Sequence, residues 1–205
     1  TWTQLSVVPG KAEFALQVLY GNKYAMDIAM NNRGSLIAAV VNIAAIGISL
    51  NPAKKQAYLV PRDGKICLDI SYMGLLHLAQ ATGAILWGQC KLVYSNDTYE
   101  SDGLDTAPTH RYNAFGERGA IVGGYCTVKT PAGDYLTEEM SLAEIKATEA
   151  TSKAKNGPWK NFWEEMARKT IVKRASKYWP RAERLDNAIH VINEDEGIHQ
   201  EPVMA

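Results

Sequence analysis

The sequence is poor in the residues from which metal sites and disulfide frameworks are built. Three of its 205 residues are cysteine and four are histidine. The cysteines, Cys67, Cys90 and Cys126, are far apart and odd in number, and the sequence contains neither a Cys-x-x-Cys nor a His-x-x-x-His motif. We therefore expect reduced, half-buried thiols and no metal site.

Two further absences exclude whole classes of protein. A nucleotide-binding phosphate loop is missing, because Gly64-Lys65 is followed by Ile66 and has no glycine at the required upstream position. No run approaches eighteen apolar residues, and the first residues, TWTQLSVVPGK, lack the charged-then-apolar layout of a signal peptide. The sequence thus predicts a soluble, intracellular protein without ATP-driven motion or membrane association.

The charged residues balance overall but are unevenly distributed. The formal net charge is zero, yet residues 153–184 contain ten Lys or Arg against three Glu, a local charge of +7. From residue 186 to the end, the chain contains Asp and Glu but no Lys or Arg. With 46% hydrophobic residues, the composition predicts one globular domain over residues 1–185 and an acidic, flexible tail over 186–205. Residues 181–191 could add one short helix.

The basic stretch, residues 156–180, has the pattern of one long helix or two helices in tandem. It opens with Asn-Gly-Pro and stops at a proline. Lys169, Lys173 and Lys177 recur every four residues on one face, and Ile171, Val172, Ala175 and Trp179 lie on the other. The face is either a solvated surface or one that holds phosphates while tryptophans stack on bases. Trp159 itself is either a stacking platform or a hydrophobic anchor.

The remaining pattern predicts an α+β fold with an antiparallel hairpin and meander packed against helices. Asp63-Gly64 between two apolar runs predicts a hairpin of residues 56–61 and 66–70. Gly123-Gly124 in a long strand indicates a bulge or a close backbone approach. The helix predicted at 35–48 is apolar on more than one side, so it is either a central core helix or a self-association surface. Further helices are expected at 10–20, 21–31 and 71–82, and further strands at 85–94, near 99, at 109–112, 120–129 and 135–140.

Glu144 and Lys146 raise an alternative function. A carboxylate and a lysine this close could belong to a metal-dependent nuclease, with both residues catalytic. Ser141 and Glu144, however, have the spacing of a capping box, which explains the carboxylate without a metal.

Two separated blocks of sequence carry a family resemblance. One contains Gly157-Pro158-Trp159 and the run FWEEMARKT at 162–170, and the other contains LNP at 50–52, AYLVP at 57–61 and YMGLLHLA at 72–79 followed by Gly83. In order and spacing, these blocks resemble the RecT/Red-beta family of phage single-strand annealing proteins, in particular its RecT branch. Glu164 and Glu165 depart from the Red-beta branch, which has basic residues there.

The resemblance implies a protein that coats single-stranded DNA and anneals it to a complementary strand without ATP. It implies an oligomeric ring or helical filament, no turnover chemistry and no cofactor, with Mg²⁺ left open as a modulator of DNA pairing. The implied partners are single-stranded DNA, the annealed duplex, a phage exonuclease and the host single-strand-binding protein, in the cytoplasm of a bacterial host cell.

Basic residues and one tryptophan are the candidates for holding DNA by its phosphate backbone. Lys55 matches a basic position of the family on the approach to DNA, whereas the other hairpin cations are either part of the site or simply solvated. The candidate DNA-binding residues are Lys54, Lys55, Arg62, Lys65, Lys153, Lys155, Trp159, Lys160, Arg168, Lys169, Lys173, Arg174 and Lys177.

Overall fold

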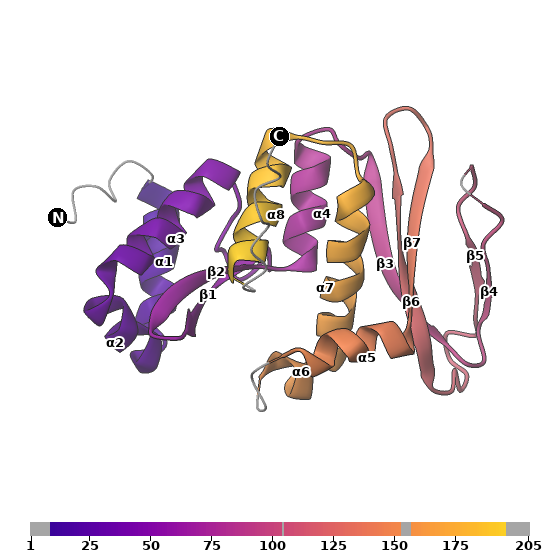
Figure 1. Ribbon diagram of the computed structural model, residues 1–205, viewed down its shortest axis with the longest axis horizontal. Helices are drawn as coiled ribbons and strands as arrows, with labels where there is room; N and C mark the ends of the chain where they lie inside the picture. Colours follow the sequence, from indigo (N-terminus) through magenta and orange to yellow (C-terminus); the bar gives the residue numbers. More distant parts are fainter. Residues whose placement is uncertain (1–8, 104, 153–156, 196–205) are drawn as a thin grey trace, which may run out of the picture. The chain divides into compact units, whose positions relative to one another are not determined.

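The computed structural model describes residues 9–103, 105–152 and 157–195 (Figure 1). Runs of helices and runs of antiparallel strands follow one another along the chain, so the predicted α+β class is confirmed. The contacts within the chain gather in two units, residues 1–78 with 182–205, and residues 79–181. None of the helices in the described part of the chain combines the length and the apolar character needed to cross a bilayer.

Helices α1 (Pro9–Tyr20), α2 (Lys23–Asn31) and α3 (Arg33–Ile46) open the first unit, as predicted. Asparagine side chains separate them: Asn22 accepts a hydrogen bond from the Ala25 amide, and Asn32 accepts one from the Ser35 amide, each at 3.2 Å. Such N-caps satisfy amides that the first helical turn leaves unpaired. Gly47, in the left-handed region, ends α3.

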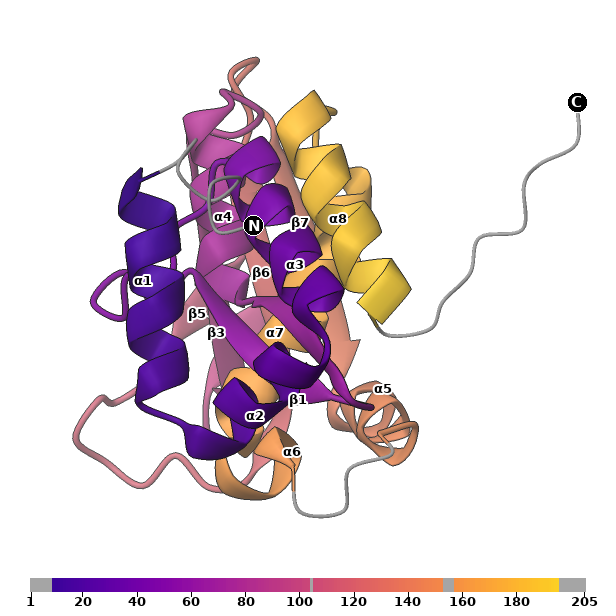
Figure 2. The ribbon, with the colours of Figure 1, turned by 90° about the vertical axis from the view of Figure 1, so that its left-hand side faces the viewer.

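The predicted hairpin is confirmed as β1 (Ala57–Arg62) and β2 (Lys65–Ile70). Asp63 and Gly64 both have positive φ, at 48° and 71°, which is the geometry of the type I′ turn that matches the twist of paired strands. Ile66, Leu68 and Ile70 are buried, and β2 packs against α3 and α8. These two helices also contact each other and lie side by side in Figure 2.

Helix α8 (Glu183–Asp195) reaches into the segment that was predicted to be a tail. Its buried residues, Leu185, Ala188, Val191 and Ile192, recur at helical spacing and pack against α3 and β2. Residues 186–195 are therefore helix rather than flexible tail, because the apolar period outweighs the acidic composition. The rest of the predicted tail, residues 196–205, lies outside the described residues.

The second unit is built on a sheet whose strand order is β3-β6-β7. These strands are β3 (Trp87–Tyr94), β6 (Ile121–Lys129) and β7 (Tyr135–Ser141). The short strands β4 (Thr98–Glu100) and β5 (Thr109–Arg111) form a separate hairpin between β3 and β6. The predicted meander of consecutive strands is therefore wrong at this point, because β3 pairs with β6 rather than with the strand that follows it. Helix α4 (Tyr72–Ala81) precedes this sheet in the chain.

Helix α7 (Trp163–Ala175) packs against one face of the sheet, where Gly124 permits the contact, and Gly123 permits a close approach of the neighbouring strand β7. A Cβ at Gly124 would lie 2.7 Å from the Ile171 Cδ1 and 2.8 Å from the Lys91 carbonyl oxygen. A Cβ at Gly123 would lie 2.5 Å from the Met140 carbonyl oxygen. The predicted close backbone approach is confirmed, and the ladder also shifts register next to it, between Val93 and Tyr94.

A buried ionic network holds the β4–β5 hairpin against the sheet. The Asp97 carboxylate, which has no exposed surface, accepts hydrogen bonds from Arg118 and lies 2.9 Å from the His110 Nε2. The Tyr125 hydroxyl lies 3.2 Å from the other ring nitrogen of His110. The guanidinium of Arg118 holds the pKa of Asp97 well below its usual range. These residues are dispersed in the sequence, and no sequence motif predicted that they would form a network.

Candidate nucleic-acid interface

The first group of candidate residues lies on the loop between α3 and β1. Lys54 and Lys55 are both exposed. Lys55 has a φ of 49°, in the left-handed region, and its carbonyl oxygen accepts a 2.6 Å hydrogen bond from the Ser71 hydroxyl. The two adjacent cations therefore belong to a loop that is tied to the start of α4.

The second group flanks the hairpin turn, where Arg62 and Lys65 are paired neighbours. The side chains of Asn32 and Ser35 hold this end of the hairpin to the start of α3. The side-chain amide of Asn32 donates to the Gly64 carbonyl oxygen at 3.3 Å, and the backbone amide of Ile66 donates to the Ser35 hydroxyl at 3.0 Å. These contacts fix the backbone beneath both cations. At about 3.3 Å per residue, the six residues of β1 place them roughly 20 Å from the Lys54–Lys55 loop.

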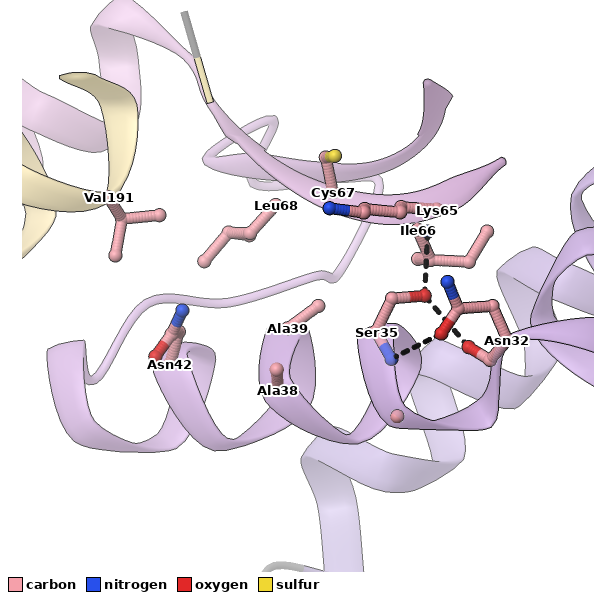
Figure 3. A pocket seen from close by; sticks show the side chains of 11 residues that line it. Asn32, Ser35, Ala38, Ala39, Asn42, Lys65, Ile66, Cys67, Leu68 and Val191 are labelled. Carbon is pink, nitrogen blue, oxygen red and sulfur yellow. Dashed lines mark hydrogen bonds between the residues drawn. The ribbon is translucent and has the colours of Figure 1, made fainter. Parts of the chain in front are cut away.

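An open groove of about 420 Å³ runs beside the hairpin, between α3, β2 and α8. Lys65 and Asn32 lie at one end of it and Val191 at the other, with Ala38 and Ala39 along α3 between them (Figure 3). Helix α3 thus buries one side, including the fully covered Ile43, and leaves another side open. The core prediction for α3 is confirmed, and self-association through its open side stays a prediction.

The third group lies on the basic stretch of the second unit, which forms two helices in tandem, α6 (Pro158–Asn161) and α7, followed by a 3₁₀ turn at Ser176–Tyr178. Lys160 lies on α6. Lys169 and Lys173 are half-buried on α7, and Lys177 is exposed in the 3₁₀ turn. The predicted apolar face is confirmed, since Ile171, Val172, Ala175 and Trp179 are all buried.

The two arginines of α7 are engaged by carboxylates. Arg168 forms ion pairs with Glu164 and Glu165, at 3.1 and 2.8 Å. Arg174 forms ion pairs with Glu138 of β7 and with Glu144, the latter at 2.7 Å. A phosphate would have to compete with these carboxylates, so the local charge counted from the sequence overstates what α7 presents to an anion.

Trp159 is an anchor of the unit's core. The residue is only 8% exposed, and its ring centroid lies 6.2 Å from that of Trp163, with the planes inclined at 60°. The Trp163 indole in turn donates a 2.8 Å hydrogen bond to Glu149 of α5 (Leu142–Ala150). A ring enclosed in this way offers no open face on which a base could stack. Phe162, the next aromatic residue, is 64% exposed.

Glu144 is used structurally, as its spacing indicated. The capping box is confirmed: the Ser141 amide donates to the Glu144 carboxylate at 2.9 Å, and the Glu144 amide donates to the Ser141 hydroxyl at 3.3 Å. The hydrogen bond from Arg174, followed by those from Ser141, lowers the pKa of Glu144 to about 2. Within the described residues, no three His, Cys, Asp or Glu side chains are grouped so as to hold a metal ion.

Two candidates, Lys153 and Lys155, lie outside the described residues. The other candidates fall into two separate units: Lys54, Lys55, Arg62 and Lys65 in the first, and Trp159, Lys160, Arg168, Lys169, Lys173, Arg174 and Lys177 in the second. Sequence reasoning missed the residues that hold the first group in place. The sequence places Ser71 only at the start of the helix expected at 71–82, because its bond to Lys55 spans sixteen residues of sequence.

The sequence model of the RecT family matches residues 13–203, nearly the whole chain. The chain belongs to the RecT family. It is 31% identical over 165 residues to protein RecT of Escherichia coli (strain K12), covering 76% of this chain and 61% of that protein. It is 24% identical over 145 residues to the uncharacterized protein YqaK of Bacillus subtilis (strain 168), covering 71% of this chain and 51% of that protein. The matched part of the chain therefore spans about half to three-fifths of the length of these curated relatives.

Membership of the RecT family confirms the resemblance that the two sequence blocks carry. The matched region includes both blocks and every candidate residue. It also spans both structural units, so the family likeness extends from α1 through α8 rather than residing in the basic helix alone.

Proposed function

We propose that this RecT-family chain binds single-stranded DNA through its phosphate backbone and anneals it to a complementary strand without ATP. Family membership supports the reaction, since proteins of this family are single-strand annealing proteins. The observation that carries the DNA site is the set of exposed cations on firmly held backbone in the first unit: Lys54 and Lys55 on their loop, and Lys65 at the hairpin turn. Lys177, exposed in the 3₁₀ turn that follows α7, is a separate candidate contact on the second unit.

Annealing by such a surface needs no bond-making chemistry. Each phosphate that is neutralised by a lysine or arginine releases counterions and reduces the repulsion between two strands. Contacts to the backbone leave the base edges free to find their complements. The same physics makes binding steeply dependent on salt and tolerant of sequence.

The working unit in this proposal is an oligomer, a ring or a helical filament, because one chain of this size covers only a few nucleotides. The open side of α3 supports self-association: Val41 is 58% exposed there, and the groove lined by Ala38 and Ala39 lies beside it. Sedimentation at micromolar concentration, with and without DNA, should show assemblies larger than one chain. Monomers alone under both conditions would contradict the proposal.

The proposed partners are single-stranded DNA, the annealed duplex, a phage exonuclease that generates the single strand, and the host single-strand-binding protein. No cofactor is required, and Mg²⁺ acts at most on DNA pairing. The alternative of a metal-dependent nuclease has lost its main support, because Glu144 serves as a helix cap and as a partner of Arg174.

A charge-reversal pair tests the site on the second unit. Lys177→Glu should weaken binding of a thymidine oligonucleotide and lower the slope of log K against log salt by at least about 0.7, the value for one neutralised phosphate on a single strand. Lys146→Glu is the matched control, since Lys146 is an exposed lysine of α5 that is not a candidate. Equal binding by the parent and Lys177→Glu would remove Lys177 from the site. A parent affinity that does not change with salt would refute phosphate binding altogether.

A further inference from the structure

Lys55 adopts a backbone conformation that lysine rarely takes. Among the described residues, Lys55 and Asp63 are the non-glycine residues with positive φ, at 49° and 48°. The hairpin turn accounts for Asp63, since type I′ turns require this conformation and favour Asp or Asn. Lys55 lies outside that turn. Glycine or asparagine would adopt the left-handed region at lower cost, so something must hold the lysine there.

The residue that holds it is Ser71, at the start of α4. The Ser71 hydroxyl donates to the Lys55 carbonyl oxygen at 2.6 Å, and the Ser71 amide donates to the Gln56 carbonyl oxygen at 3.0 Å. The same hydroxyl accepts a hydrogen bond from the Gly74 amide at 3.0 Å and so caps the helix. One serine thus closes the first turn of α4 and grips two successive peptide groups of the basic loop.

Gly74 lets the loop come close enough for this grip. A Cβ at Gly74 would lie 2.2 Å from the Gln56 carbonyl oxygen, which is backbone and cannot swing away. Gln56 is buried, and its side-chain oxygen accepts a 3.1 Å hydrogen bond from the Ser49 amide. The loop is therefore fixed on both sides of the peptide that follows Lys55.

The loop also carries its own turn. The Lys54 amide donates to the Asn51 carbonyl oxygen, and the Ala53 amide donates to the Asn51 side chain, each at 2.9 Å. With the grip of Ser71, this turn leaves little backbone freedom at the two exposed lysines. Interactions made by groups that are already ordered lose less conformational entropy on binding.

We propose that Ser71 and Gly74 are positioning residues of the DNA site, which hold the Lys54–Lys55 loop in the geometry that receives phosphates. The inference rests on the proposed function, because it assigns these residues a role in single-stranded DNA binding. A lysine kept in a conformation that suits glycine indicates that its ammonium group is needed at that point of the backbone. Neither Ser71 nor Gly74 has to touch the DNA.

The first test compares two helix caps in the same unit. Ser71→Ala removes the cap of α4 together with the bond to Lys55, whereas Asn22→Ala removes only the cap of α2. Both should lower the melting temperature. Only Ser71→Ala should weaken binding of a thymidine oligonucleotide. The ratio of parent to variant affinity should be about fivefold larger at 0.1 M salt than at 1 M salt, which corresponds to the loss of one phosphate contact with a salt slope of about 0.7. Ser71→Thr, which keeps the hydroxyl, should restore both affinity and slope.

The second test asks whether Ser71 acts through the two lysines. The variant Lys54→Gln/Lys55→Gln removes two phosphate contacts, so its salt slope should be smaller by about 1.4. Its affinity relative to the parent should then be roughly 25-fold lower at 0.1 M salt than at 1 M salt. Adding Ser71→Ala to it should then cost no further affinity, because coupled residues are not additive. If Ser71→Ala lowers DNA affinity as much in this background as in the parent, the inference is overturned, because Ser71 would then act independently of the two lysines.

A third measurement needs no DNA and separates this inference from the proposed function. Amide hydrogen exchange at residues 53–56 in the free protein should speed up in Ser71→Ala and stay at the parent rate in Asn22→Ala. Unchanged exchange in Ser71→Ala would overturn the grip whatever the DNA titrations give. If exchange speeds up while DNA affinity and slope stay at the parent values, the positioning role fails and the proposed function stands on its other contacts.

Discussion

Replacing Trp159 by alanine separates a core anchor from a base-stacking platform. The structure buries this side chain in α6 beside the ring of Trp163. Truncating a buried tryptophan costs about 3–5 kcal/mol of unfolding free energy. With an m-value of about 2 kcal/mol/M in urea, the unfolding midpoint should fall by about 2 M. Folded Trp159→Ala should bind single-stranded DNA as the parent does.

Phe162→Ala is the matched control for this prediction, since it truncates a neighbouring aromatic side chain that is mostly exposed. It should change the unfolding free energy by about 0.5 kcal/mol or less. A stacking role for Trp159 would give the opposite pattern, with a normal urea midpoint and a binding loss of about 1–3 kcal/mol, or roughly 5- to 150-fold. That pattern in urea titrations and DNA titrations would refute the assignment of Trp159 to the core.

Two further predictions concern the second unit. Gly124→Ala should lower the unfolding free energy by about 1–3 kcal/mol because its Cβ would meet Ile171. Gly34→Ala in α3 is the control, since its Cβ would be at an ordinary contact distance from its neighbours, and it should be neutral or stabilising. Equal urea midpoints for the two variants would contradict the packing of α7 on the sheet. The pKa of Asp97 is lowered by Arg118, so its carboxylate stabilises the fold above the ordinary pKa of about 4 and loses this effect as pH falls. The stability advantage of the parent over Asp97→Asn should therefore shrink below about pH 4, and a constant difference in urea titrations would show that the pKa is not depressed.

Local signals in the sequence predicted much of the fold. Asp63-Gly64 identified the hairpin because few residues tolerate the positive φ of a two-residue turn. Ser141 and Glu144 identified the start of α5 because both capping bonds lie within four residues. Helix α8 was partly misjudged, because its acidic residues masked an apolar face that only α3 and β2 explain.

The failures share one physical origin, since each depends on residues far apart in the chain. The pairing of β3 with β6 skips the inserted hairpin, which β-propensity alone cannot reveal. The ion pair between Arg174 and Glu138 joins α7 to β7, so part of the positive charge counted along the helix is neutralised by a residue of another element. The grip of Ser71 on Lys55 likewise becomes visible only when α4 lies against the loop.

Annealing by sequential addition of strands tests the central claim most directly. A fluorophore-labelled strand is bound first, its quencher-labelled complement is added without ATP, and pairing is followed with Mg²⁺ at low and high salt, while the length of the strands is checked on a gel. The account predicts that the protein accelerates pairing at low salt, that the acceleration falls steeply as salt rises, and that both strands keep their length. Pairing at the protein-free rate, or strands shortened in the presence of Mg²⁺, would contradict it.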